Sequence, residues 1–191
     1  RHYCFRVMRV LRLLLPFLVV LLIVGAIALV LSSRPQLEDA RDEVDARWRA
    51  VAAPLTARYE LLAAASTAAR ANTGPAGAVA AEVDTALAAW AEARDGEVAG
   101  AVDAANDLEG LGRRLVAAVA ASPALAGDPA VQAAIAGFAM AAPPEPATPF
   151  VTAVRAYEDE RDGPLRGVVA GALGYDAIPV LVIAAPPAAP T

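Results

Sequence analysis

The chain has 191 residues, enough for one modest domain and an anchor, and a formal net charge of -5. Its 16 basic residues are all arginine, and four of them precede Ser33, where no acidic residue occurs. All 21 carboxylates follow Ser33, so the rest of the chain is acidic. Nucleic-acid binding depends mainly on basic side chains that neutralise phosphates, so this balance argues against DNA or RNA as a partner.

A basic flank over residues 1–12 precedes an uncharged run over residues 13–33, LLLPFLVVLLIVGAIALVLSS. At 1.5 Å per residue this run is long enough to cross a hydrocarbon core of about 30 Å. It predicts a single transmembrane helix, with the lipid bilayer as a partner. The alternative is a cleavable signal peptide with Ala26-Ile27-Ala28 as the cleavage site, but the run exceeds the roughly 7 to 15 apolar residues of such a leader.

The charges beside the span predict its orientation. The arginines before it have no acidic neighbours, whereas those after it are mixed with carboxylates, which favours a cytoplasmic N-terminus and an extracytoplasmic domain at the plasma membrane. Within the span, Gly25, Ala28 and Ser32 are small residues that are candidates for close packing against another membrane helix. The alternative is that they only fill the helix.

Residues 34–175 follow a helical period. Leu37, Val44, Trp48, Val51, Leu55 and Leu62 form one apolar seam, and Arg41 and Arg58 occupy its missing steps, with their stems on the core and their charged heads at the rim. Pro54 is expected to kink this helix.

The rest of this domain predicts three further helices. The turn Asn72-Thr73-Gly74-Pro75, with Gly74 as a left-handed cap, leads to a second helix from residue 75 to 121. Asp128-Pro129 starts a third helix that ends near Met140. A fourth follows the non-helical stretch AAPPEPATP and runs from residue 149 to 173, with a bend at Gly163-Pro164. The fold class is all-α: an antiparallel bundle of about four helices, the first two of them long.

The tail over residues 176–191 is apolar and rich in Ala and Pro, which favours extended conformations. Its VLVI run is open to two interpretations, an edge strand or an apolar strip. The candidate contact residues for a partner are Tyr175, Pro179, Val180, Leu181, Val182 and Ile183.

The stretch VDARWRAVAAPLTARYELL, residues 44–62, resembles the motif that follows the membrane helix in LemA-family proteins. Tyr59 and Glu60 stand where the family has His and Asp, and near the C-terminus Val151 and Glu158 replace the asparagines of its Tyr-Asn repeat. The matching positions are Val44, Asp45, Trp48, Leu55, Arg58, Leu61 and Leu62, then the Ser122–Leu125 segment, and finally Tyr157, Gly171, Gly174, Tyr175 and Pro179.

The resemblance implies a single-pass membrane protein with a bundle of long helices and no settled biochemical activity. It also implies a cytoplasmic bundle, which is opposite to the orientation that the flanking charges favour.

The sequence offers little for chemistry. His2 is the only histidine and Cys4 the only cysteine, so neither a zinc site of familiar spacing nor a Ser-His or Cys-His pair can be assembled. Glu158, Asp159 and their acidic neighbours up to Asp162 are interpreted as a solvated helix face, since consecutive helical side chains diverge; a calcium-like cation is the alternative. We therefore expect no catalytic residue, metal, cofactor or small-molecule substrate.

These observations lead to two functional hypotheses. The first is a non-enzymatic, membrane-anchored helical scaffold or accessory subunit of a larger bacterial membrane assembly, for which a respiratory complex is one candidate host. The second is an envelope sensor or ligand-binding module of the LemA type, in which the kinks at Pro54 and Gly163-Pro164 line a pocket. An apolar cavity with convergent polar groups is expected only of the second.

Overall fold

The computed structural model describes residues 2–72, 74–162 and 166–183, and before Arg34 it describes the side chains of Val20, Leu21, Val24 and Gly25 only. The described chain consists of helices and loops and contains no strand. The prediction of an all-α fold is therefore confirmed. The VLVI run of the tail belongs to a segment without regular structure rather than to a strand.

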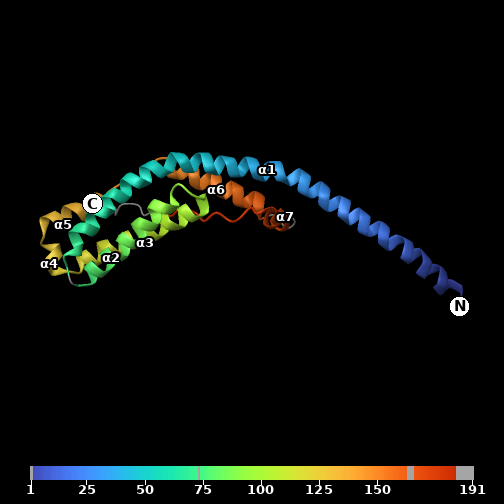
Figure 1. Cartoon of the computed structure of the whole chain (residues 1–191), viewed down its shortest axis with the longest axis horizontal. Helices are drawn as coiled ribbons and strands as arrows, with labels where there is room; N and C mark the ends of the chain where they lie inside the picture. Colours follow the sequence, from blue (N-terminus) through green and yellow to red (C-terminus); the bar gives the residue numbers. More distant parts are fainter. Residues whose placement is uncertain (1, 73, 163–165, 184–191) are drawn as a thin grey trace, which may run out of the picture.

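Helix α1 extends from His2 to Arg70, so the predicted membrane span and the predicted first bundle helix are one continuous helix of 69 residues. It passes Pro54 without interruption, and Figure 1 shows that it curves over the other helices at one end and projects far beyond them at the other. The predicted seam is correct, because Leu37, Val44, Val51, Leu55 and Leu62 are all buried.

The predicted second helix is in fact two. Helix α2 covers Pro75–Ala93 and helix α3 covers Val98–Ala120, joined by a turn in which the Gly96 N–H donates to the Ala93 carbonyl. One straight helix would expose its apolar stripe, whereas the hairpin packs α2 and α3 against each other and against α1. Gly74 is also not left-handed, since its φ is -88°.

Two short helices close the far end of the bundle. Helix α4 covers Pro123–Ala126 and helix α5 covers Pro129–Ala139. The prediction of Asp128 as the N-cap is confirmed, because its side chain accepts hydrogen bonds from the backbone N–H groups of Ala130 and Val131.

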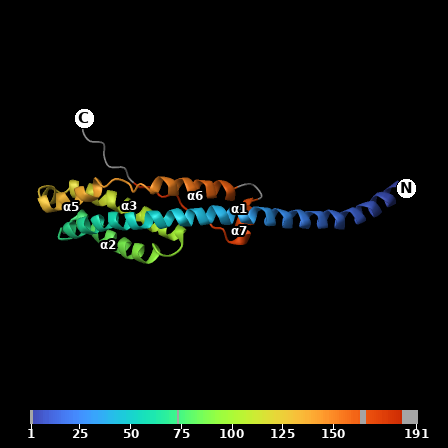
Figure 2. The same ribbon diagram turned by 90° about the horizontal axis from the view of Figure 1, so that it is seen from above.

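The chain then returns along α1. Helix α6 covers Ala147–Arg161, two residues earlier than predicted, and helix α7 covers Arg166–Leu173; the predicted bend at Gly163-Pro164 lies outside the described residues. Figure 2 shows α2 and α6 on opposite sides of α1, and both pack against it. Residues 174–183, which we call the strap, continue from α7 without regular structure.

The bundle has one continuous core, which includes side chains from every helix from α1 to α6 and from the strap. It begins on α1 at Val44 and includes the strap residues Ile178 and Leu181. Among the parts of the chain that the structure describes, no helix is both long enough and apolar enough to cross a membrane.

Candidate functional site

Four aromatic rings meet near the middle of the bundle. Trp48 lies 6.1 Å from Trp90 and 5.3 Å from Phe150, between ring centroids, and Tyr59 lies 5.1 Å from Trp90. Both tryptophans are buried, as the apolar seam predicts for Trp48. Edge-on ring pairs of this kind contribute about 0.5 to 1.5 kcal/mol beyond their buried area.

The polar groups of this cluster are mostly paired with backbone. The Tyr59 hydroxyl donates to the Ala105 carbonyl at 3.2 Å, and the Trp48 indole N–H donates to the Arg94 carbonyl at 3.4 Å. Burial, followed by the nearby Glu109 carboxylate, raises the pKa of Tyr59 far above its ordinary value of 10. The hydroxyl is therefore protonated at neutral pH and serves to orient the ring rather than to transfer protons.

A buried ion pair joins α1 to α3 beside the aromatic cluster. The Arg58 Nε lies 2.6 Å from one oxygen of Glu109, and its Nη2 lies 3.1 Å from the other, so the contact is bidentate. The same guanidinium donates to the Ala141 carbonyl at 2.6 Å and lies 4.5 Å from the Phe138 ring centre. One arginine thus ties α1 to α3, to α5 and to the loop after it.

This pair corrects the prediction that the Arg58 head group would lie at the rim of the core. Both Arg58 and Glu109 are buried, and the sequence reasoning did not single out Glu109 at all. The available signal was position: Glu109 falls four residues after Ala105 and directly after Leu108, on the face of α3 that is buried.

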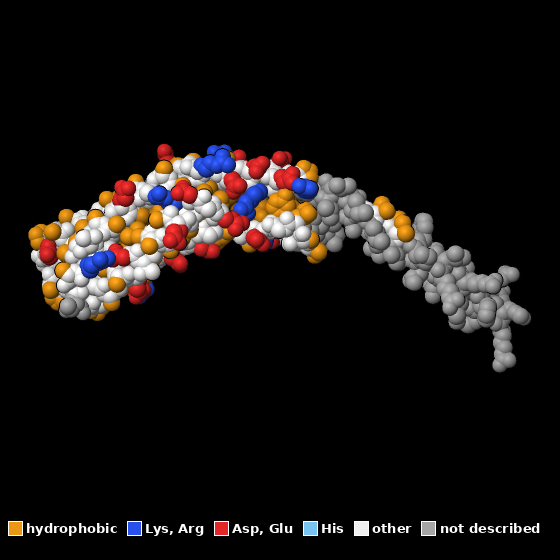
Figure 3. Space-filling view, in the orientation of Figure 1, with side chains coloured by type: hydrophobic (Ala, Val, Ile, Leu, Met, Phe, Trp, Pro, Cys, Tyr) orange, Lys and Arg blue, Asp and Glu red, His pale blue; other side chains and the backbone are white. Residues whose placement is uncertain are grey.

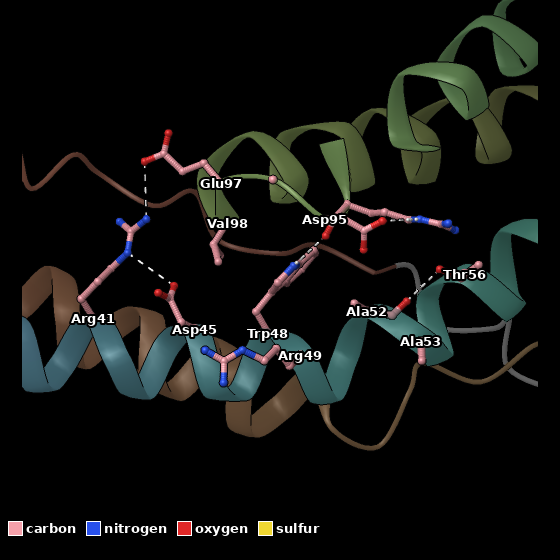
Figure 4. Close-up of a pocket in the computed structure, with 12 residues that line it drawn as sticks. Arg41, Asp45, Trp48, Arg49, Ala52, Ala53, Thr56, Asp95, Glu97 and Val98 are labelled. Atoms are coloured by element: carbon pink, nitrogen blue, oxygen red, sulfur yellow. Dashed lines mark hydrogen bonds and ion pairs between the residues drawn. The ribbon is translucent and has the colours of Figure 1, made fainter. Parts of the chain in front are cut away.

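A groove of about 660 Å³ lies between α1 and the turn that joins α2 to α3. Figure 4 shows Trp48 between the two walls, with Arg41 and Asp45 on one wall and Asp95 and Glu97 on the other. The lining residues are Arg41, Asp45, Trp48, Arg49, Ala52, Ala53, Thr56 and Arg94 through Val98.

Charge in the groove is largely balanced by internal ion pairs. Arg41 lies 3.5 Å from Asp45 and 3.5 Å from Glu97, and Arg94 lies 3.3 Å from Asp95. Arg49 is exposed and forms no ion pair with any residue in the described part of the chain. The groove therefore offers one available cation, Arg49, which suits a small anionic or zwitterionic group.

The strap lies in an extended conformation and is held by side chains of α3 and α6. The Tyr157 hydroxyl donates a hydrogen bond to the backbone carbonyl of Asp176, at 2.8 Å. The backbone N–H of Ile178 donates a hydrogen bond to the Glu158 carboxylate, at 2.7 Å. Asn106 forms two bonds: its Nδ2 donates to the Val180 carbonyl at 3.0 Å, and its Oδ1 accepts from the Val182 N–H at 2.8 Å. The strap is therefore bound to the bundle as an extended peptide.

The structure distributes the predicted contact residues of the tail between core and surface. Leu181 is buried, Pro179 is half-buried, and Tyr175 and Ile183 pack against the core, whereas Val180 and Val182 are exposed. Of the small residues in the predicted span, Gly25 is exposed, and the side chains of Ala28 and Ser32 lie outside the described residues.

Acidic side chains near the end of α6 form ion pairs and hydrogen bonds within the bundle. Arg161 lies 3.0 Å from both Glu158 and Asp162, and Glu158 also accepts the bond from the strap. Across the described ranges, no group of three or more acidic, histidine or cysteine side chains is arranged to hold a metal ion.

The described residues thus define an all-helical protein with a buried ion pair, a small charged groove and an internally bound C-terminal strap. No protein-family model, curated protein or solved structure matches the chain.

Proposed function

We propose that this protein is a non-enzymatic, membrane-anchored helical accessory protein that braces a larger bacterial membrane assembly. The observation that carries the proposal is the contrast along α1. Val20 and Leu21, within the uncharged run of residues 13–33, are 57% and 62% exposed, whereas Val51 and Leu55 further along the same helix are fully buried. An apolar helix surface without protein around it suits the interior of a bilayer.

The continuity of α1 gives the proposed anchor a mechanical role. A helix that is unbroken from His2 to Arg70 contains no flexible linker between the apolar run and the bundle core. The tilt and rotation of the anchor in the membrane would therefore set the orientation of the bundle. We propose a brace rather than a loosely tethered domain, with the N-terminus in the cytoplasm as the flanking charges favour.

The proposed partner is another membrane protein, with a respiratory complex as the first candidate host. Gly25 is the candidate for a close helix contact within the bilayer, because it is small and exposed and no atom of this chain lies within 4 Å of the place that a side chain would take. Outside the bilayer, Val180 and Val182 of the strap offer exposed apolar side chains.

The LemA resemblance remains part of the proposal and adds a physical interpretation of its motif. Of the matching positions on α1, Val44, Trp48, Leu55, Arg58 and Leu62 are buried. Residues in these positions hold helices together, so the motif supports a structural role better than a catalytic one.

Purification of the full chain in a mild detergent tests the proposal. We expect a membrane-protein partner in a fixed ratio, and we expect Gly25→Leu to weaken its retention because the larger side chain separates the two helices. Val24→Leu is the matched control, since a large apolar side chain already occupies that position. Recovery of the chain as a lone monomer under all mild conditions would contradict the accessory role.

The groove between α1 and the α2–α3 turn favours a second candidate, a ligand-binding sensor. Ala52, Ala53 and Thr56, which flank Pro54, line it, and most of its other lining residues are charged. Small carboxylates and amino acids should then raise the melting temperature of the wild-type protein but not of Ala52→Trp, in which the groove is filled. If none of them shifts the melting temperature of the wild-type protein, the sensor hypothesis fails.

A further inference from the structure

Helix α7 lies where α1 leaves the bundle. Figure 1 shows α7 against α1 at the end of the bundle from which the long N-terminal part of α1 projects, and the two helices are in contact. Ala170 of α7 and Leu37 of α1 are buried, so α7 is packed on the bundle and does not hang free.

The outer surface of α7 is apolar. Val168 is 73% exposed, the largest exposed fraction among the large hydrophobic side chains that the structure describes, and Leu173 is also exposed. Gly167, Gly171 and Ala172 are exposed too, so the outer surface of this short helix carries no charge at any of these positions. Figure 3 shows hydrophobic side chains gathered at this end of the bundle.

Tyr175 extends this surface to α1. Its ring packs against the core, and the hydroxyl is near enough to the Arg34–Glu38 ion pair to respond to both charges. Desolvation, and then the Glu38 carboxylate, raise the pKa of the hydroxyl, and Arg34 lowers it. A tyrosine and an arginine next to an apolar helix surface are typical of the boundary between lipid and water, where each keeps its apolar part in lipid and its polar end in water.

The height of this surface matches the boundary of the proposed anchor. Arg34 and Glu38 follow Ser33, so at 1.5 Å per residue they lie within about 8 Å of the end of the uncharged run. The headgroup layer is about 5 to 7 Å thick on each side of the hydrocarbon core. If residues 13–33 span the core, α7 is level with the headgroups.

We propose that α7 and Tyr175 form a foot that rests on the lipid surface, with Val168 and Leu173 inserted at the boundary between headgroups and acyl chains. The inference rests on the proposed membrane anchor and adds a second point of contact. Two contacts would fix the rotation of the bundle about α1, which a single spanning helix leaves free.

The occupant of this surface is lipid rather than an anionic partner. Arg34 is paired with Glu38 at 2.7 Å, and Asp176, which follows the foot, is exposed and negative. The exposed side chains that the structure describes on α7 are all uncharged, so we propose that the contact depends on apolar insertion.

The test uses the full chain in phosphatidylcholine nanodiscs, with Cys4→Ala as the background so that a single fluorophore can be placed. An environment-sensitive dye is attached at Val168→Cys, at Val20→Cys in the anchor, or at Ala133→Cys on α5 at the far end of the bundle. Lipids that carry a nitroxide near the headgroup then quench dyes at the surface, and lipids with a deep nitroxide quench dyes in the core.

The foot predicts surface quenching and a blue-shifted emission at residue 168, deep quenching at residue 20 and neither at residue 133. Quenching at residue 20 with no more quenching at 168 than at 133 would overturn the foot and leave the anchor intact. Absence of quenching at residue 20 would overturn the anchor, and the foot with it.

A second measurement avoids the dye, which could itself enter lipid. Hydrogen exchange of residues 166–173 in nanodiscs should become faster in Val168→Asp, while exchange in α3 stays unchanged because Val168 is exposed and outside the core. Ala172→Ser, on the same exposed surface, is the mild control. Equal exchange in α7 of the wild type and Val168→Asp would contradict the lipid contact.

Discussion

The two parts of α1 have the same backbone conformation and opposite surroundings. Around Val20 and Val24 the apolar side chains are more than half exposed, whereas Val44 and Val51 are fully buried. The first part is apolar on all sides, and the second has one apolar stripe and a charged outer face with pairs such as Arg47–Glu43 at 2.7 Å.

The arrangement of apolar residues around a helix, and not their number, therefore indicates its surroundings. A stripe needs a protein partner on one side, and a helix that is apolar on every side needs an apolar medium. Here both patterns occur on one unbroken helix, so the pattern of apolar side chains changes near Arg34 while the backbone stays helical.

The same substitution, made in each part of α1, should have very different effects on the free energy of unfolding. Val51→Asp places an unpaired carboxylate in the core and should lower the free energy of unfolding by about 5 kcal/mol or more. Val20→Asp should leave the unfolding of the bundle unchanged, because residue 20 lies outside the core. Urea titration in detergent, followed by circular dichroism, measures both. Equal destabilisation would mean that the two parts share one folded core.

The buried ion pair provides the next largest effect. Glu109→Ala leaves the Arg58 guanidinium buried without its carboxylate and should cost about 3 to 5 kcal/mol. Glu82→Ala removes a carboxylate from the exposed pair with Arg114, at 2.7 Å, and should cost less than about 1 kcal/mol. The midpoint of urea unfolding reports the difference, and similar midpoints for the two variants would show that the buried pair does not hold α1 to α3.

Two glycines of α3 differ in the space that surrounds them. A Cβ at Gly112 would lie 2.5 Å from the Phe138 ring, which packs under Arg58, so Gly112→Ala should destabilise by about 1 to 3 kcal/mol. At Gly110 the nearest atom is 3.9 Å away, and Gly110→Ala should stabilise by up to about 1 kcal/mol through helix propensity. Melting temperatures that move in the same direction would refute the close contact at Gly112.

The smallest effect is expected at the strap. Asn106→Ala removes both side-chain bonds to the strap backbone and should lower its local stability by about 1 kcal/mol while the core remains folded. Hydrogen exchange of residues 180–183 should become faster. Asp107→Ala, at the exposed neighbouring position, should leave this exchange unchanged; if both variants behave alike, Asn106 does not hold the strap.

The sequence predicted what local patterns encode. The apolar seam of α1, which includes Trp48, follows from a helical period, and the N-cap Asp128 follows from the proline after it. Both depend on residues a few positions apart. The Ala- and Pro-rich composition of the tail over residues 176–191 also favours an extended conformation, and residues 176–183 have no regular structure.

Features that depend on distant residues were not predicted. Glu109 lies at a position that faces the core, but a carboxylate is ordinarily exposed, and only the approach of Arg58, 51 positions earlier, makes its burial favourable. The break between α2 and α3 at Gly96 depends on the free energy gained when the two helices pack together. This gain competes with the helix propensity of the segment, and neither helix alone shows which of the two is larger. The hydrogen bond from the Asn106 side chain to the Val180 carbonyl joins residues that are 74 positions apart.

Flotation of membranes after alkaline carbonate extraction tests whether residues 13–33 hold the chain in a bilayer, as we propose. We predict that the full chain floats with the lipid at its full mass. We also predict that Leu21→Arg combined with Val24→Arg releases it, since each arginine near the middle of a span costs about 2.5 to 3.5 kcal/mol. A wild-type chain that stays in the soluble fraction, or one that has lost its first 28 residues, would contradict the claim.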